Sequence, residues 1–405
     1  MFRQMKIHVE QLGDGGVLLH ADATAPHAAL DALAGQAQCV YIDPPFMTGD
    51  AFKRRRAFGE TGWRTGRQSI VLPAYDDQFP SREAYLTFLR KLVERAKALL
   101  APTGVFCLHL DWRTAAWGRI ICDEVFGEKL FLNEIVWAYE SGGRATRRFS
   151  RKHDTLLLYG RSRKYTFDIS RVALERAGTR RNHMRRQVDE KGRAYSSIRS
   201  GGKEYRYYDD APVYPGDVWT DISHLQQRDP ERTGYATQKP IKLLDRILKP
   251  VVKPGDLVID LCCGSGTTPA AARGLGCRYV GVDCHADALQ VAAARLKASY
   301  RLEADSAEGS AKLDATFDPA TGVVTLLGFD AGDPLYPRDE DRLAAVEQWR
   351  AGRIVDGEMQ VQQAFWRSRK HPDLPVWTII PEGEGQPAVS LTDASGRRWV
   401  WVWEA

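Results

Sequence analysis

The segment Asp43-Pro44-Pro45-Phe46 has the residue types needed to clamp a planar aromatic amine. It follows the apolar run Cys39–Ile42, which is typical of a buried strand. Two proline rings fix their own φ angles and remove backbone donors, which leaves the Pro44 carbonyl free to accept a hydrogen bond. With the Asp43 carboxylate it offers two acceptors for an amino group, while Phe46 offers a face for a flipped nucleobase. A strand end followed by a buried Phe is the alternative interpretation of these four residues alone.

A second segment, residues 256–283, has the pattern of a strand, a glycine turn, a helix and a second strand. Gly264 and Gly266 would let the backbone approach a ligand closely, and Asp283 at the end of the second strand suits a ribose diol. The turn Gly-Ser-Gly-Thr-Thr lacks the third glycine of a dinucleotide motif at the expected spacing, which argues against a dehydrogenase. The segment therefore predicts a crevice for a nucleoside cofactor.

In their order, these two motifs resemble those of the beta-class DNA amino-methyltransferases, in which a catalytic Asp-Pro-Pro-aromatic motif precedes the cofactor motif. Further segments resemble motifs of that family in the same order, over about residues 5–300: Leu18–Asp22, Gly104–Arg113, Asn133–Gly143, Lys152–Tyr159 and Arg232–Pro240. Several segments in register make a chance match much less plausible than one segment would.

The resemblance implies transfer of a methyl group from S-adenosylmethionine to the exocyclic amino group of a flipped base in double-stranded DNA. Adenine N6 is preferred over cytosine N4, because Asp is the commoner first residue of the motif in adenine enzymes. Catalytic roles are implied for Asp43, Pro44, Pro45 and Phe46. The residues implied to hold the cofactor are Asp22, Asp260, Cys262, Gly264, Gly266, Thr267, Asp283, Gln238, Lys239 and Pro240. Two departures are Cys262, where the family usually has Phe, and Met47, where Asn is common.

Basic residues gather between the two motifs. Residues 161–210 contain 14 Lys and Arg against seven Asp and Glu, whereas the whole chain has a net charge of only +5. Tyrosines are interleaved with them, as expected of a nucleic-acid contact, and the family keeps its target-recognition region at this position. A solvated, partly disordered loop is the alternative. The residues predicted to contact DNA are Arg180, Arg181, Arg185, Arg186 and Arg199, together with Arg54 and Arg55.

Arg54 and Arg55 belong to the basic run Lys53–Arg56, which is followed by three glycines up to Gly66. This composition predicts a mobile loop beside the catalytic motif. Such a loop is well placed to contact phosphates and to close over a flipped base, although a disordered surface loop fits the composition equally well.

Alternating strands and helices predict an α/β fold, a Rossmann-like methyltransferase sheet with an inserted target-recognition region and a small α+β C-terminal appendage. Residues 1–160 and 211–305 are assigned to the catalytic and cofactor-binding domain, 161–210 to target recognition and 306–405 to the appendage. The appendage is expected to contain a helix at 339–351 and to serve packing or dimerisation. The expected strands are 38–42, 105–110, 132–138, 155–159, 257–261 and 279–282, and the expected helices are 82–100, 114–126, 241–252 and 287–300.

The seven cysteines form no CxxC pair or zinc-type cluster, so no metal site is predicted. Without a signal peptide or long apolar span, we expect a cytoplasmic prokaryotic protein that acts at the nucleoid and not at a membrane. Homodimerisation and a cognate restriction endonuclease are left open. So are two other functions: a non-catalytic DNA-recognition subunit, and methylation of RNA or a protein glutamine, which the motif order disfavours.

Overall fold

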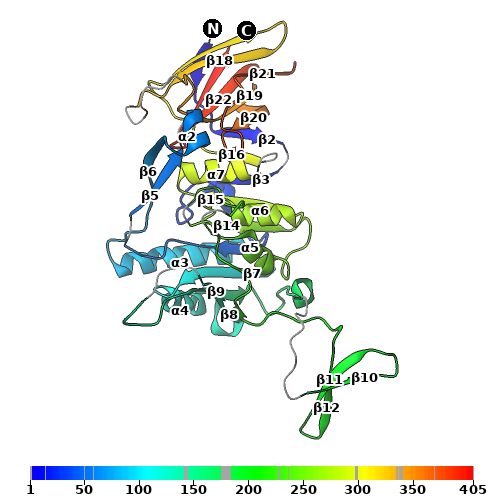
Figure 1. Ribbon diagram of the computed structural model, residues 1–405. Coiled ribbons are helices and arrows are strands. Elements are labelled where there is room, and N and C mark those ends of the chain that lie inside the picture. The colour runs from blue at the N-terminus through cyan, green and yellow to red at the C-terminus, as the bar shows by residue number, and fades with distance from the viewer. Residues whose placement is uncertain are drawn as a thin grey trace.

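The computed structural model describes residues 2–404 except 14, 50, 58, 141–144, 175–183, 227–228, 236, 297–299, 334–335, 337–340 and 369, and it describes only the backbone of 51–56, 72–76 and 185. The molecule is elongated (Figure 1). A central sheet with flanking helices continues at one end into β-structure, and a small three-stranded sheet projects from the other end.

The central part of the sheet is mostly parallel. Strands β16, β3, β15, β14, β4 and β7 run parallel to one another, and β9 is antiparallel between β7 and β8. In spatial order the strands are β16 (Tyr300–Glu303), β3 (Gly16–His20), β15 (Arg278–Asp283), β14 (Leu257–Asp260), β4 (Ala37–Ile42), β7 (Leu100–Asp111), β9 (His153–Gly160), β8 (Phe131–Ala138) and β13 (Val218–Trp219). This arrangement confirms the predicted Rossmann-like sheet.

Helices cover both faces of this sheet, which explains why its strands are almost continuously apolar. In β4, Cys39 and Tyr41 pack in one core cluster, and Val40 and Ile42 pack in the other. The first cluster includes residues of α5 (Ile241–Leu248), α6 (Thr267–Gly274) and α7 (Ala286–Leu296). The second includes residues of α1 (Ala28–Asp31), α3 (Arg82–Leu99) and α4 (Ala115–Phe126), with the short helix η1 (Glu128–Leu130) after α4. The four predicted helices and six predicted strands of this half are confirmed, apart from their ends. None of the described helices is both long and apolar enough to cross a lipid bilayer.

The C-terminal strands continue the same sheet beyond β16. Next come β2 (Val9–Leu12), β20 (Glu358–Trp366), β19 (Val346–Val355), β22 (Gln386–Asp393), β23 (Arg398–Trp403) and β1 (Phe2–Met5). A second sheet contains β17 (Lys312–Asp318), β18 (Val323–Asp330) and β21 (Trp377–Ile379). Trp349, Trp399 and Trp401 are buried with side chains of both sheets. Because β1 pairs with β23, the two termini lie side by side (Figure 1).

The prediction of a helix at 339–351 is wrong over its described residues, 341–351. Turns there lead into β19, which is hydrogen-bonded to β20 on one side and β22 on the other. All residues from Val346 to Gly352 are buried. Spacing that suits a helix is overridden here by pairing with two strands that lie later in the chain. The described residues of 306–404 are therefore β-structure and turns, not the predicted α+β mixture.

The basic run Lys53–Arg56 lies in a strand and not in a mobile loop. β5 (Ala51–Ala57) pairs with β6 (Ser69–Asp76), and α2 (Gly59–Thr65) connects the two strands. Trp63 Nε1 donates to Glu347 Oε1 at 3.1 Å, and the Gly59 amide donates to the Ala344 carbonyl at 3.1 Å. The loop prediction is wrong because contacts with residues nearly 300 positions away order this segment.

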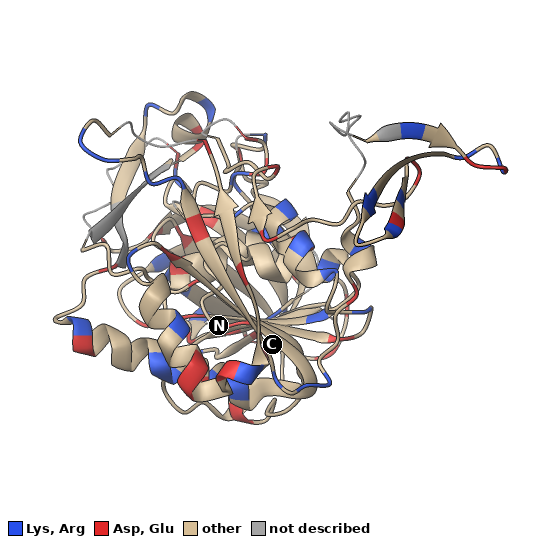
Figure 2. Ribbon diagram, turned by 90° about the horizontal axis from the view of Figure 1, so that it is seen from below, with Lys and Arg blue, Asp and Glu red and all other residues tan. Residues whose placement is uncertain are grey.

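A three-stranded antiparallel sheet lies within the predicted target-recognition region and extends away from the body (Figures 1 and 2). Its strands are β10 (Arg185–Val188), β11 (Ala194–Ser200) and β12 (Lys203–Tyr208), and the short helix η2 (Ile169–Val172) precedes them. We call residues 184–209 the arm. Lys, Arg, Asp and Glu all occur along it (Figure 2).

Candidate active site

The two sequence motifs meet at the carboxyl ends of neighbouring strands. Asp43 follows β4 directly, and Asp260 ends β14, the strand paired in parallel with β4. The helices after these strands lie on opposite faces of the sheet, and a crevice forms at such a point in α/β proteins. A cavity of about 390 Å³ lies here. Of the predicted residues it is lined by Asp22, Asp43, Pro44, Pro45, Phe46, Gln238, Lys239, Asp260, Cys262, Gly264, Thr267 and Asp283.

The Asp43 carboxylate has one engaged oxygen and one free oxygen. Oδ2 accepts a hydrogen bond from Lys239 Nζ at 2.5 Å, and the two side chains are only 16% and 10% exposed. Oδ1 is buried and has no hydrogen-bond partner among the described residues. Lys239 Nζ also lies 5.3 Å from the centroid of the half-buried Phe46 ring. A buried acceptor without a partner is costly, so Oδ1 is available for a ligand donor.

A buried carboxylate holds the backbone directly after this motif. Asp77, which is 1% exposed, accepts hydrogen bonds from the Met47 amide at 2.8 Å, the Thr48 amide at 3.0 Å and Thr48 Oγ1 at 2.7 Å. Met47 has a φ of +55°, in the left-handed region that non-glycine residues rarely adopt. Asp77 therefore fixes a strained turn beside the clamp, and the sequence analysis missed it.

The glycine turn has a left-handed backbone at both of its glycines. Gly264 and Gly266 have φ angles of +48° and +73°. A Cβ atom on Gly266 would lie 2.7 Å from Ala292 Cβ in α7, so only glycine fits there. The Gly264 amide donates to Asp283 Oδ2 at 2.8 Å, which joins the turn to the end of β15. Gly266 itself does not line the cavity.

The carboxyl group of Asp260, which lies beneath this turn, has a raised pKa. Its Oδ1 accepts from the Cys262 amide at 3.0 Å. Burial raises the pKa of the Asp260 carboxyl to about 7, and the nearby negative charges of Asp43 and Asp283 act in the same direction. Near neutral pH this group exchanges a proton, so its charge will respond to a ligand in the cavity.

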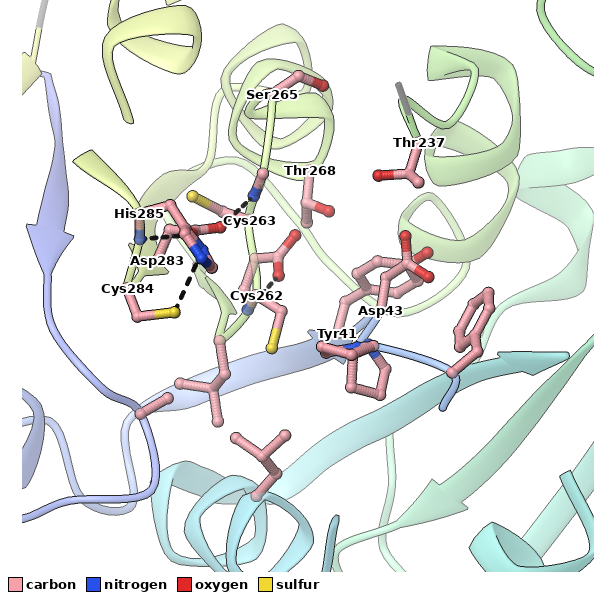
Figure 3. A pocket seen from close by; sticks show the side chains of 18 of the residues that line it. Tyr41, Asp43, Thr237, Cys262, Cys263, Ser265, Thr268, Asp283, Cys284 and His285 are labelled. Carbon is pink, nitrogen blue, oxygen red and sulfur yellow. Dashed lines mark hydrogen bonds and ion pairs between the residues drawn. The ribbon is translucent and has the colours of Figure 1, made fainter. Parts of the chain in front are cut away.

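The far end of the cavity is formed by Asp283, Cys284 and His285, away from Asp43, Tyr41 and Thr237 (Figure 3). Asp283 Oδ1 accepts from the His285 amide at 2.9 Å and lies 3.3 Å from His285 Nδ1. This contact, with help from Cys284, raises the pKa of His285 to about 10. The three side chains are also a group whose ligand atoms all lie within 4.8 Å, which could hold a metal ion; it is formed by adjacent residues and was not considered in the sequence analysis.

Two of the residues predicted to bind the cofactor make hydrogen bonds within the protein, and a third lies outside the cavity. Gln238 Oε1 accepts from the Thr233 amide and hydroxyl, both at 2.8 Å, and its amide group donates to the Glu231 carbonyl. Thr267 Oγ1 donates to the Lys239 carbonyl at 3.2 Å. Pro240 immediately precedes α5 and does not line the cavity.

A buried polar chain lies under the clamp and was also missed from sequence. Tyr41 Oη and His109 Nδ1 are 2.7 Å apart, His109 Nε2 and Asp154 Oδ2 are 3.1 Å apart, and Tyr139 Oη donates to Asp154 Oδ1 at 3.1 Å. Burial alone would raise the pKa of Asp154, but the hydrogen bond and charge of His109 lower it below its ordinary value. The chain keeps a negative charge close to Lys239.

The residues predicted to contact DNA are only partly described. Arg186, in β10, forms an ion pair with Asp209 at 3.0 Å and is 74% exposed, and Arg199 is exposed on β11. Arg180 and Arg181 lie outside the described residues, as do the side chains of Arg54, Arg55 and Arg185.

Comparisons with known proteins find relatives whose names describe them as type II methyltransferases. The first relative, "Type II methyltransferase M.EcaI" of Enterobacter cloacae, is 24% identical over 294 residues, which cover 61% of this chain and 62% of the relative. "Type II methyltransferase M1.MboII" of Moraxella bovis is 28% identical over 235 residues, 54% of this chain and 84% of the relative. The chain thus spans less than two thirds of the length of the first of these relatives.

Two solved structures with similar folds are a complex of M1.HpyAVI with SAM and the PvuII DNA methyltransferase described as cytosine-N4-specific. The first has a TM-score of 0.43 and 16% identity, covering 69% of this chain and 98% of that one. The second has a TM-score of 0.44 and 12% identity, covering 71% and 89%. A family model described as DNA methylase matches residues 37–294, which contain both motifs and most of the residues that line the cavity. The chain therefore belongs to the DNA methylase family.

Proposed function

We propose that this protein is an S-adenosylmethionine-dependent DNA methyltransferase that acts on an exocyclic amino group. The carrying observation is that Asp43 Oδ1, a buried acceptor without a described partner, lines the same cavity as the glycine turn. The cavity volume of about 390 Å³ is within the range for ligand sites. The left-handed glycines and the Asp283 carboxylate fit a nucleoside cofactor, and Asp22 also lines the cavity.

The chain's residues would activate and orient the amino group. Its nitrogen is a poor nucleophile because its lone pair is delocalised into the ring. Hydrogen bonds to Asp43 Oδ1 and the Pro44 carbonyl favour a pyramidal nitrogen, and Phe46 fixes the plane of the base. S-adenosylmethionine supplies a methyl group on a cationic sulfur. The amino nitrogen would bond to that carbon as the carbon–sulfur bond breaks with its electron pair left on sulfur, and the nitrogen would then release one proton to solvent. No covalent enzyme intermediate is needed.

Adenine N6 is the base position we propose, with cytosine N4 as the second candidate. The choice of adenine is supported by Asp43 as the first residue of the motif. The clamp itself does not distinguish the two bases, because both amino groups offer it the same donors. Mass spectrometry of nucleosides from DNA incubated with the protein and S-adenosylmethionine would decide between them. N4-methylcytosine alone would contradict the choice of adenine, and no methylated base would contradict the function.

Asp43→Asn tests the catalytic assignment. The amide retains the size of the carboxylate but lacks its charge, so we expect methyl transfer to fall by at least about 10²-fold. Binding of S-adenosylmethionine, measured by calorimetry, should remain within a few-fold of the wild type, because the glycine turn is intact. Transfer at the wild-type rate would exclude Asp43 from the reaction.

We also propose that the arm binds DNA through one of its faces. The strand register places Val188, Ile198, Tyr205 and Tyr207 on the same face, where they are 41–65% exposed. Arg186 shares that face. On the opposite face Tyr195 and Tyr208 pack together, with Arg206 over Tyr195 and Arg193 over Tyr208. The open face therefore combines aromatic and basic groups that suit contacts with bases and phosphates.

Two further partners remain hypotheses. The type II relatives suggest a cognate restriction endonuclease with the same recognition sequence. Packing and dimerisation were both open roles for the C-terminal part of the chain, and packing accounts for Trp349, Trp399 and Trp401. Sedimentation of the purified protein with and without DNA would test the dimer.

A further inference from the structure

Lys239 lies where the clamp, the base-stacking ring and the cofactor turn meet. Its Nζ atom is 2.5 Å from Asp43 Oδ2 and 5.3 Å from the centroid of the Phe46 ring. Its backbone carbonyl accepts from Thr267 Oγ1, in the first residue of α6. The side chain is 10% exposed, so its charge is little screened by water. The sequence pattern alone assigned this residue to the cofactor pocket.

We propose that Lys239 is a positioning residue for methyl transfer, which holds Asp43 Oδ2 so that Oδ1 remains an ionised, correctly aimed acceptor for the amino group. This inference rests on the proposed function and deepens it. A carboxylate can rotate about its Cβ–Cγ bond, and a cation fixed on one oxygen removes that freedom. The oxygen left over is the buried atom without a described partner. The engaged Oδ2 and the unpartnered Oδ1 of the same carboxylate together support this positioning role.

The surroundings of Asp43 explain why a cation is needed. The groups whose negative forms affect this region are Asp260 of β14, Asp154 of β9, Asp283 of β15, Tyr41 of β4, Cys107 of β7 and Cys262 of the turn. His109 of β7 contacts Asp154, and His224 packs on Trp137 of β8. Burial and the charge of Lys239 both lower the pKa of His224, so this imidazole tends to be neutral. The raised pKa of His285 places a positive charge beside Asp283, whereas Lys239 is the cation that contacts the Asp43 carboxylate itself.

Without this ammonium, Asp43 would face several acids in a buried site and would take up a proton at higher pH. A protonated Asp43 loses an acceptor and gains a competing donor. Lys239→Met removes the charge and keeps most of the apolar stem, Lys239→Arg keeps the charge, and Lys239→Gln is a second neutral variant in case Met prevents folding. Circular dichroism and S-adenosylmethionine binding would establish that each variant is folded.

We expect kcat at saturating DNA and cofactor to fall by at least about 10²-fold in K239M and K239Q, and less in K239R. The acid limb of the kcat–pH profile should move to higher pH in the neutral variants only, while the Kd for S-adenosylmethionine changes by less than a few-fold. An unchanged kcat and profile would overturn the proposal. So would a large rise in that Kd with kcat retained, since Lys239 would then serve the cofactor pocket.

A measurement without turnover separates this inference from the proposed function. Carbon-13 NMR of labelled aspartate carboxyls, assigned with Asp43→Asn, follows the protonation of Asp43 directly. We expect Asp43 to be protonated at higher pH in K239M than in the wild type. If the wild type methylates no DNA but the NMR shift occurs, the proposed function fails and the ion pair still has its effect. If Asp43 titrates identically in both proteins, the positioning role is excluded even in an active enzyme.

Discussion

Met47 adopts a left-handed backbone conformation directly after the clamp, and a side chain other than glycine or asparagine resists it. A non-glycine residue in this region costs about 1–3 kcal/mol. Because Asn tolerates it better, Met47→Asn should stabilise the protein by up to about 1 kcal/mol. The urea midpoint of unfolding would measure this, and a lower midpoint than the wild type would contradict it. Met47→Ala is the matched control, because it shortens the side chain without this conformational benefit.

Asp77 holds the same turn through three hydrogen bonds, so its loss should affect catalysis more than cofactor binding. Asp77→Ala removes the two carboxylate oxygens that accept from the Met47 and Thr48 amides, and hydrogen bonds to a charged group are worth about 1.5–3 kcal/mol each. We expect kcat to fall by more than about 10-fold, since the clamp loses its support. Asp77→Asn keeps one acceptor oxygen and should lie between Asp77→Ala and the wild type. Equal kcat in all three proteins would show that the clamp needs no support from Asp77.

The separation in sequence between a residue and the residues it contacts determines whether its role can be predicted from the sequence. Asp43, Phe46 and the glycine turn belong to contiguous motifs, in which each residue's neighbours already constrain its geometry. Asp77 is 30 residues from Met47, and Lys239 is 196 residues from Asp43. Their pairing depends on the order of strands in the sheet. Sequence correctly predicts the alternating strands and helices of the sheet that forms the crevice, but not which side chains meet there.

At the scale of elements, the arm offers two faces that can be tested separately. Tyr205→Ala and Tyr207→Ala each remove an exposed ring from the open face, and stacking on a base is worth about 1–3 kcal/mol. We expect the Kd for target DNA to rise accordingly, with S-adenosylmethionine binding unchanged. Tyr214→Ala, which removes a 44% exposed ring outside residues 161–210, is the matched control. Equal DNA affinity in all the variants would move recognition away from this face.

Asp260, at the end of β14, should make the free energy of unfolding depend on pH. An unfolded Asp titrates near pH 3.9, whereas burial raises the pKa of Asp260 to about 7. Between these values the folded protein holds a proton that the unfolded chain has released. Stability should therefore fall as pH rises from about 4 to 7 and should then level off, with an upper limit of about 4 kcal/mol from this group.

Asp260→Asn checks this dependence, because an amide cannot titrate. The free energy of unfolding of the variant relative to the wild type should increase between pH 5 and pH 7.5 in urea titrations without cofactor. Asp314→Asn, at an exposed position of β17, should leave the dependence unchanged. A constant difference between Asp260→Asn and the wild type over this range would contradict the raised pKa.

At the scale of the whole molecule, a buried ionic cluster joins the C-terminal strands to the cofactor half. Glu10 of β2 is fully buried and accepts from Arg398 of β23, and its Oε1 lies 3.0 Å from Arg350 Nε of β19. Arg350 also donates to Tyr300 Oη of β16 at 3.1 Å and to Gln290 Oε1 of α7 at 3.1 Å. Burial alone would raise the pKa of Glu10, but the two guanidinium groups more than offset it, and the pKa is lowered.

This arrangement could not be predicted from local sequence patterns. Glu10 is 340 residues from Arg350 and 388 from Arg398, and the strand that contains Glu10 reads as an ordinary half-polar segment. The change in composition after residue 305 suggested an attached appendage. The sheet instead runs through β16 and β2 into β20, so the first strands of the chain lie among the last. We therefore expect the two parts to unfold together.

Glu10→Ala tests that expectation because it leaves two buried guanidinium groups without their carboxylate. Removing one partner of a buried ion pair costs about 3–5 kcal/mol.

Glu358→Ala is the matched control, since Glu358 pairs with Arg301 at 2.8 Å but is 33% exposed, and such pairs contribute about 0–1 kcal/mol. Urea unfolding should be followed both by tryptophan fluorescence, to which the C-terminal part contributes six of the eleven tryptophans and the rest of the chain five, and by loss of S-adenosylmethionine binding. For Glu10→Ala both midpoints should fall by the same amount, whereas a drop in fluorescence midpoint alone would show that the two parts unfold independently.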